Sequence, residues 1–418
     1  MTLQSVMDMS YQQQVLCFEF IQVAIGMKES LSAVLIEEDW AYLFEFCKRQ
    51  ALIGVGFTAV EKLHRKGESC PQGLRMKWMS LALRTENLND KLSRQCTEVV
   101  GRYGQDGLYA CVLKGQGNLL NYPEDLGVRR MPGDIDVWCM APCCGLVIPV
   151  LDGGRSQIGK LCHGRKAVME YVMMQHRRSG GKEQPHIRYN HIEAPTLEGT
   201  EIEVHYRPSF CRNLLRNIRL QRWFASHADE CMKHNTPMGF SVPTASVNVV
   251  YQMTHLFSHY FDEGLGLRQL MDYFFTLKAW HNDVAECWSR QSQLGMWCEG
   301  LGVPVMSAEE IMCTLRSFGM GKFAGAVMWV LHEVFAMPVQ YYICQPDGHE
   351  GRKMLSEIMQ GGNFGQYDER GKAMKQGGMV KHGMWKFLRI MRLVPSYPGE
   401  ALWEPVFRAY HWLWRQVQ

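Results

Sequence analysis

Apolar residues recur every three or four positions through the first quarter of the chain, which is the period of helices that bury one face. Phe18, Ile21 and Ala24 mark one such stretch. Glycine, serine and proline gather at residues 66–71 and predict a break, after which residues 73–103 interleave leucines with charged side chains. This part is therefore predicted to be helical and to end in one long helix before the first strand.

The pattern changes after residue 106. Residues 108–113 form a short apolar run that stops at a glycine-rich turn, as a buried strand does. Residues 133–139 (GDIDVWC) alternate acidic and apolar side chains, which predicts a second strand. Proline and glycine then interrupt the chain, and residues 158–176 carry apolar positions at helical spacing. This order of elements predicts an α/β unit.

Two further strands are predicted at residues 187–193 and 201–207, joined by the loop Ala194–Gly199 as a β-hairpin. The second strand alternates polar and apolar residues strictly, which is typical of a half-buried strand. Its two glutamates and its histidine then share one face.

The remainder of the chain is predicted to be mainly helical. Residues 245–260 and 267–280 have helical periodicity on either side of a glycine pair, and Pro243-Thr244 is a typical helix start. Residues 345–380 are rich in glycine and in charges of both signs. We interpret them as a mobile loop or linker.

These patterns predict an α+β fold, in which a small mixed sheet with flanking helices lies between N-terminal and C-terminal helical regions. With 418 residues the chain is long enough for more than one domain. The predicted parts are an N-terminal helical region (1–106), an α/β core (107–210), a helical substrate or packing domain (211–340), and a glycine-rich loop with a basic aromatic tail (341–418).

Composition narrows the class of protein. An apolar content of 46% with 21% charged residues is ordinary for a globular protein and excludes a disordered chain. The formal net charge of +3 is too small to indicate a nucleic-acid partner by itself. The 15 cysteines lack the spacing of a disulfide framework, residues 1–14 lack the features of a secretory signal, and no apolar stretch reaches the roughly 20 residues that cross a membrane. We expect a cytoplasmic protein without a transmembrane segment.

Two carboxylates stand two residues apart in the second predicted strand. At that spacing Asp134 and Asp136 point to the same face. Two anions held so close repel each other unless a cation lies between them, and hard oxygen ligands favour Mg²⁺ or Mn²⁺. The alternative is an exposed edge strand with two solvated carboxylates.

The segments before and after these acids favour the metal site. Glycines after a strand let backbone N–H groups approach phosphate oxygens closely. In the hairpin, Glu201 or Glu203 could complete a cluster of three carboxylates, and strand pairing would bring His191 or Glu193 close to it. The glycine-rich turn consists of Lys114, Gly115, Gln116 and Gly117.

Together these motifs resemble the nucleotidyltransferase superfamily of DNA polymerase β and the aminoglycoside nucleotidyltransferases. They are more similar to a bacterial family of uncharacterised nucleotidyltransferases, in which LKG, an arginine, GDID and an acid-apolar-His-aromatic strand follow one another. The matching residues here are Leu113–Gly115, Arg129 or Arg130, Gly133–Asp136 and Glu203–Tyr206. The resemblance covers roughly residues 35–290.

The resemblance implies an enzyme that moves an NMP group from an NTP such as ATP to an acceptor hydroxyl and releases pyrophosphate. It implies that Asp134 and Asp136 hold Mg²⁺ or Mn²⁺ with the nucleotide. Glu203, whose apolar neighbours fit the family better than those of Glu201, would help to bind a second metal and to deprotonate the acceptor. The implied phosphate-neutralising groups are Lys114 and either Arg129 or Arg130.

Two departures from the family's pattern concern triphosphate binding. Gln116 follows Gly115 directly, where the superfamily usually has Gly or Ser, and an insertion lengthens the segment between Gly115 and Asp134. Two other functions remain open on the same fold. One is a nucleotide-binding or regulatory protein with weak or no catalysis, and the other is a nucleotidyltransferase that modifies nucleic acid.

Histidines and cysteines suggest two weaker metal hypotheses. His255 and His259 lie four residues apart on one helical face, but without the glutamate of an H-E-x-x-H site we favour a structural or substrate-contacting role. Cys139, Cys143 and Cys144, with Cys162 and His163 further on, have neither C-x₂-C nor C₂H₂ spacing, and zinc is not expected there.

Basic and aromatic residues alternate through the tail from residue 371 to 418. Such a stretch can lie on an anionic membrane surface or stack on nucleic acid. More often it is an amphipathic helix packed on its own protein, and this is the reading we prefer.

Overall fold

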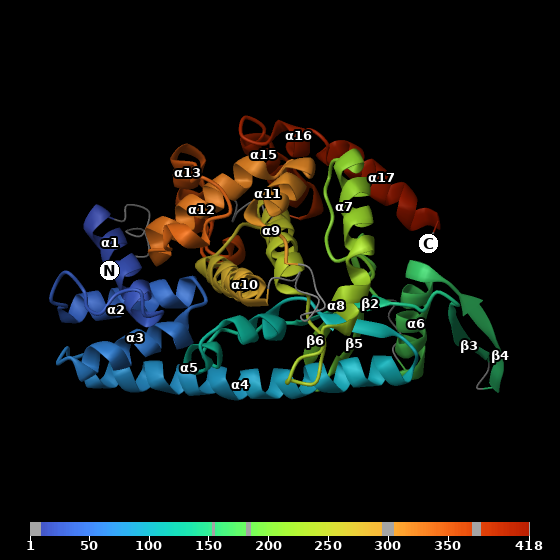
Figure 1. Cartoon of the computed structure of the whole chain (residues 1–418), viewed down its shortest axis with the longest axis horizontal. Helices are drawn as coiled ribbons and strands as arrows, with labels where there is room; N and C mark the ends of the chain where they lie inside the picture. Colours follow the sequence, from blue (N-terminus) through green and yellow to red (C-terminus); the bar gives the residue numbers. More distant parts are fainter. Residues whose placement is uncertain (1–9, 153–154, 181–184, 295–304, 370–377, 418) are drawn as a thin grey trace.

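The computed structural model describes residues 10–152, 155–180, 185–294, 305–369 and 378–417. The long helix α4 (Gln72–Gln105) runs along one side of the molecule, beneath the N-terminal helices and then beneath the sheet (Figure 1). It packs on α3 in its first part and on β1 and β2 in its second. One helix therefore connects the helical region to the α/β unit.

The N-terminal region is helical, as predicted. Ser10 caps the first helix through a capping box with Gln13, and the predicted break falls between α3 and α4. The Trp78 indole N–H donates to the carbonyl of Ile53 at 2.7 Å and joins α4 to α3 in the core. The helices before α4 are α1 (Tyr11–Ala24), α2 (Glu37–Arg49) and α3 (Ile53–Arg65).

The central sheet has the strand order β1-β2-β6-β5, with β2 and β6 parallel and the two outer pairs antiparallel. This confirms the predicted small mixed sheet in an α+β fold. Buried Val137 and Val204 pack with Val99 of α4 and Val172 of α6. The strands are β1 (Tyr109–Val112), β2 (Ile135–Met140), β5 (His191–Leu197) and β6 (Thr200–His205).

The hairpin that carries Glu203 is confirmed, but its boundaries differ from the prediction. The strand before the turn begins at His191 and continues through Pro195, which is tolerated because β5 is an edge strand and is irregular there. The predicted loop is instead the tight turn Glu198-Gly199, where both residues have positive φ, as a two-residue hairpin turn requires.

The predicted helix at residues 158–176 is only partly correct. Its first residues belong to β4 (Arg155–Cys162), which forms a separate hairpin with β3 (Leu146–Asp152), and α6 begins only at Gly164 and ends at Arg178. The apolar positions that suggested a helix, such as Val168 and Val172, are buried as expected.

The chain after the sheet is helical, as predicted, and α9 and α10 begin at the expected positions. Figure 1 shows most of these helices above the strands, on the side opposite α4. No helix in the described part of the chain is both long and apolar enough to cross a membrane. The helices are α7 (Leu214–Ser226), α8 (Ala228–Lys233), α9 (Ala245–Asp262), α10 (Leu267–Leu294), α11 (Ala308–Ser317) and α12 (Gly321–Phe335).

The interpretation of residues 345–380 as a mobile loop is wrong for its first half, which contains α13 (Gly348–Gly361). The Asp347 side chain accepts hydrogen bonds from two N–H groups of its first turn. Gly351 is needed for packing, because a Cβ there would lie 2.4 Å from the Trp329 ring of α12. Residues 370–377 lie outside the described residues.

The tail is packed on its own protein, which confirms the preferred reading. Trp385 and Ile390 of α15 and Phe407 of α17 are buried. Buried Arg212 ties the tail to the body of the molecule, with its Nε 2.6 Å from a carboxylate oxygen of Glu404. The tail helices are α15 (Met379–Leu393), α16 (Pro398–Ala401) and α17 (Glu404–Val417).

Candidate active site

Two neighbouring parallel strands supply the acidic residues. Asp134 directly precedes β2, Asp136 lies within it, and Glu203 lies in β6 opposite Asp136 in the strand register. The ligand oxygens of these three carboxylates lie within 4.8 Å of one another. The structure thus brings together the cluster that the sequence suggested, while Glu201 is exposed and does not belong to it.

Lys114 follows β1 and projects toward the acids. Its Nζ lies 3.1 Å from an oxygen of Asp136 and 3.9 Å from an oxygen of Asp134. Burial by itself lowers the pKa of Lys114, but the carboxylates of Asp134, Asp136 and Glu203 outweigh burial and hold that pKa above its ordinary value. Lys114 is therefore a fixed positive charge beside the acids.

His205 bridges the two strands from the other side of the acids. Its Nε2 lies 2.9 Å from an oxygen of Asp136 and 3.4 Å from an oxygen of Glu203. Burial lowers the pKa of His205, yet these hydrogen bonds raise it to about 9. Burial raises the pKa of Glu203, while His205 and Lys114 lower it below its ordinary value. Sequence reasoning placed His205 on this face without a role.

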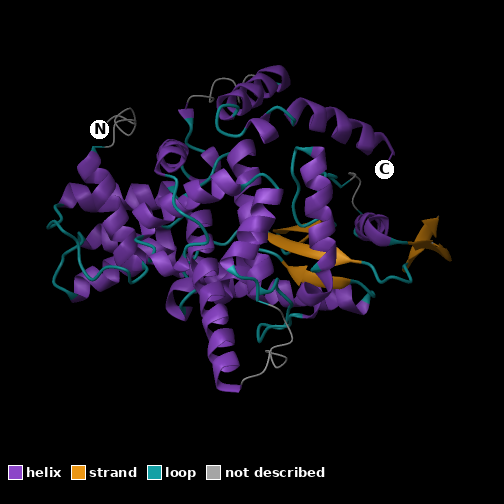
Figure 2. Ribbon diagram, turned by 45° about the horizontal axis from the view of Figure 1, so that its top comes forward, coloured by secondary structure: helices purple, strands orange, loops and turns teal. Residues whose placement is uncertain are grey.

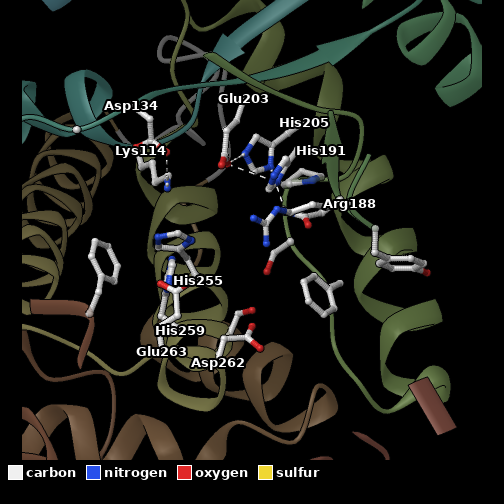
Figure 3. A pocket seen from close by; sticks show the side chains of 18 of the residues that line it. Lys114, Asp134, Arg188, His191, Glu203, His205, His255, His259, Asp262 and Glu263 are labelled. Carbon is white, nitrogen blue, oxygen red and sulfur yellow. Dashed lines mark hydrogen bonds and ion pairs between the residues drawn. The ribbon is translucent and has the colours of Figure 1, made fainter. Parts of the chain in front are cut away.

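A cavity of about 440 Å³ opens in front of the acids. The ends of the strands form one wall, the C-terminal half of α9 and the first turn of α10 form a second, and the tail contributes side chains from α15 and α17 (Figure 3). Of the described residues of the tail, Lys386, Phe407, His411 and Arg415 line it. The volume suits a small ligand.

The two arginines proposed for phosphate binding are both engaged elsewhere. Arg129 forms ion pairs with Glu61 of α3 and Glu86 of α4, and does not line the cavity. Arg130 does line it, but its Nε and Nη2 lie 2.6 and 2.7 Å from the carboxylate of Asp272. Both side chains thus fasten the inserted segment to helices.

Arg268, in the first turn of α10, was missed by sequence reasoning. It lines the cavity, donates through Nη1 to the carbonyl of Met131 at 3.0 Å, and its buried Nε has no hydrogen-bond partner among the described residues. Burial and the neighbouring Arg130 lower the pKa of Arg268 to about 10. Arg268 reaches the cavity because α10 packs beside Gly133, and this contact between distant segments has no local sequence signal.

The glycine turn keeps its cavity side open despite Gln116. Gly115 has a φ of 60° and lines the cavity. The Gln116 side chain is buried on the other side, where its Nε2 donates to the carbonyl of Asn89 at 3.1 Å and to Ser93 at 3.0 Å on α4. Gly117 approaches β1 closely, since a Cβ there would lie 2.9 Å from the carbonyl oxygen of Val112.

His255 and His259 line the cavity from α9, with ring centroids 4.3 Å apart. Burial and then His259 lower the pKa of His255 well below its ordinary value, which leaves that ring neutral. Among the described residues, neither of the two groups that could hold a metal includes these histidines or a cysteine. The placement agrees with a structural or substrate-contacting role.

The donor set fits Mg²⁺ or Mn²⁺. Three carboxylates converge, and those of Asp134 and Glu203 are 34% and 25% exposed on the cavity side, so a cation can reach them. Asp136 is buried and anchors the group. Such a cluster beside a lysine and an arginine suits a cation bound to a phosphate ester.

A family model described as "Uncharacterised nucleotidyltransferase" matches residues 37–298. The chain therefore belongs to this family of nucleotidyltransferases, as its motifs indicated. Among curated proteins and among solved structures, no chain matches this one. The match includes the glycine turn, the acidic cluster, α9 and α10, whereas the tail that closes the cavity lies beyond it.

Proposed function

We propose that this protein is a metal-dependent nucleotidyltransferase, which moves an NMP group from an NTP to an acceptor hydroxyl and releases pyrophosphate. The observation that carries this proposal is the convergence of Asp134, Asp136 and Glu203 within 4.8 Å at the wall of a cavity. Membership of a nucleotidyltransferase family supports the reaction type.

In this proposal the three carboxylates hold Mg²⁺ or Mn²⁺ on the side that faces the cavity. The cation, when bound, offsets charge on the phosphate oxygens and on the attacking and leaving oxygens. Glu203 also accepts the proton of the acceptor hydroxyl, because its oxygen lies at the cavity surface while the more buried Asp136 is held between Lys114 and His205.

The triphosphate lies on the side of Lys114 and Gly115 in this proposal. Lys114 neutralises phosphate charge, and Arg268 adds a second cation whose Nε is free of protein partners among the described residues. Arg130 shapes this wall through its pair with Asp272, and Arg129 holds the same segment from behind. Gln116 supports the turn from α4 and leaves the phosphate side clear.

A direct test is transfer of an α-labelled NTP to acceptors in a cell extract with Mg²⁺ or Mn²⁺, with pyrophosphate release measured in parallel. A γ-label should not be transferred. Glu203→Gln should lower turnover by roughly 100-fold or more while sparing nucleotide affinity, because a base acts in the transition state. Glu201→Gln, at the exposed glutamate on the same strand, is the matched control and should be nearly unchanged.

Two results would count against the proposal. Equal losses from the two glutamate variants would reject Glu203 as the base. Absence of α-label transfer with every common NTP, by a protein that still binds NTP and metal, would favour the nucleotide-binding regulator on the same fold.

A further inference from the structure

His191 is a buried histidine whose ring lacks the hydrogen bonds that burial normally demands. The residue is 6% exposed, and neither ring nitrogen has a hydrogen-bond partner among the described residues. Its Nδ1 lies 3.4 Å from an oxygen of Glu203 but does not form a hydrogen bond with it. A buried polar group left in this state points to a missing ligand.

The strand register explains why this ring meets two other possible ligands. His191 of β5 stands opposite His205 of β6, and the two ring centroids lie 5.0 Å apart. His191, Glu203 and His205 each offer one ligand atom, and these atoms lie within 4.8 Å of one another. Figure 3 shows the three side chains converging at the top of the cavity, beside Lys114 and Asp134.

The ligand types separate this group from the acidic cluster. Imidazole nitrogen suits Zn²⁺, Co²⁺ and similar transition metals, whereas Mg²⁺ prefers oxygen. We propose that His191, Glu203 and His205 form a second cation site, which takes a transition metal ion and shares Glu203 with the three-carboxylate site. An ion bound there displaces the proton that His205 holds between Asp136 and Glu203. The role of this ion rests on the proposed function: it would bind the oxygen of the acceptor hydroxyl beside Glu203.

The probe is Co²⁺, added to the metal-free full-length protein and followed by its visible absorption and by X-ray absorption at the cobalt edge. We expect a bound ion with two imidazole ligands. His191→Gln should weaken Co²⁺ binding at least tenfold and remove one imidazole from the X-ray signal. Asp134→Asn, which alters only the carboxylate site, should leave both signals in place.

His186→Gln is the matched control, since His186 lies five residues away and is exposed. If His191→Gln fails to fold, the imidazole count of the wild-type Co²⁺ protein still decides. Cobalt bound by oxygen alone, or equal affinity in His191→Gln, would overturn the site. If the wild-type protein shows Mg²⁺-dependent transfer but binds no Co²⁺ through histidine, only this inference is rejected. If it binds Co²⁺ through histidine but shows no transfer, only the proposed function is rejected.

The outer face of the tail is a second, independent observation. Helices α15, α16 and α17 lie along one outer edge of the molecule (Figures 1 and 2). In α17, Phe407 and Trp414 pack against Tyr189, while Val406 and Leu413 point outward. The exposed large apolar side chains of the tail are Met384, Phe387, Leu388, Leu402, Val406, Tyr410, Trp412 and Leu413.

The charges on this outer face are of one sign. Among the described side chains of α15 to α17, the exposed charged residues that do not line the cavity are Arg392 and Arg408, whereas Glu400 and Glu404 are buried. Arg408 also pairs with the inner glutamate Glu404. A second copy of the face would set arginine against arginine. Nucleic acid could stack on the exposed aromatic rings, but it offers nothing for the aliphatic side chains such as Leu402, Val406 and Leu413 to pack on. We infer that the tail binds the surface of an anionic lipid bilayer, where apolar side chains and arginines both find partners.

Flotation with vesicles of phosphatidylglycerol and phosphatidylcholine tests this surface. The full-length protein should float with these vesicles at low salt and should not float with phosphatidylcholine alone. Trp412→Glu with Leu413→Glu should reduce binding at least tenfold, whereas Val339→Glu, an exposed apolar position outside the tail, should not. No binding to anionic vesicles, equal binding by the double variant, or binding to RNA or to a second copy through this face instead, would overturn the inference.

Discussion

Asp136 and Glu203 stand opposite each other across the parallel pair of β2 and β6, although a hairpin, a helix and a third strand separate them in the chain. Parallel strands place equivalent side chains at the same height, so the two carboxylates meet without distortion. Like charges at this distance repel, and Lys114 and His205 hold them together. This arrangement of two carboxylates and two cations leads to the first of the following predictions.

The first prediction concerns the carboxylate site. Mg²⁺ or Mn²⁺ with an NTP should raise the melting temperature, since a ligand that binds only the folded state stabilises it by about 2.7 kcal/mol at one hundred times its dissociation constant. Asp134→Asn with Asp136→Asn should abolish this shift. Asp125→Asn, at an exposed acid of the inserted segment, should preserve it. A metal-dependent shift that survives the double substitution would place the site elsewhere.

The second prediction separates the arginines. Arg268→Gln should raise the KM for NTP at least tenfold, about 1.4 kcal/mol, because a phosphate then loses a cation that has few protein partners. Arg129→Gln should instead lower the free energy of unfolding and leave KM nearly unchanged, because its ion pairs tie the inserted segment to α3 and α4. Steady-state kinetics and urea unfolding of both variants check this, and a larger KM effect at Arg129 would reverse our assignment.

A third prediction concerns the attachment of the tail. Glu404→Gln should destabilise the protein by about 3 kcal/mol, because buried Arg212 loses a charged partner. Arg408→Gln breaks only an exposed pair with the same glutamate and should cost less than about 1 kcal/mol. Urea unfolding measures both. Similar small losses would show that the tail contributes little to folding.

The fourth prediction is a pH dependence at Glu350 in α13. Burial raises the pKa of this carboxyl, but hydrogen bonds from Ser396, Lys353 and Lys322 outweigh burial and lower it to about 2. A depressed folded-state pKa adds stability above the unfolded value and loses it as the pH falls from about 5 toward 2. Glu350→Gln should therefore destabilise the protein at pH 7, and the difference from wild type should shrink on acidification. A difference independent of pH would exclude this linkage.

The sequence by itself determined most of the helices and the strands that carry Asp134, Asp136 and Glu203. Periodicity is a local property, so alternation placed Glu201 and Glu203 on one face of a strand, and the break before α4 followed from glycine and proline. The choice of Glu203 over Glu201 came from the resemblance to the family. The sequence did not predict the β3–β4 hairpin or the correct boundaries of the β5–β6 hairpin. The edge position of β5 tolerates Pro195, and edge position is a property of the sheet, not of the segment.

Only the tertiary structure decided which charges face the cavity. Arg129 and Arg130 occupy the sequence position of the family's arginine, but both form ion pairs with acids of distant helices. Arg268 lies at the cavity only because α10 packs there. The direction of Gln116 depends on α4, and the orphaned ring of His191 depends on the β5–β6 register. Such contacts join residues far apart in the chain, and no local pattern encodes them. Sequence spacing therefore predicts the acids, whereas long-range packing determines which cations and which histidine lie beside them.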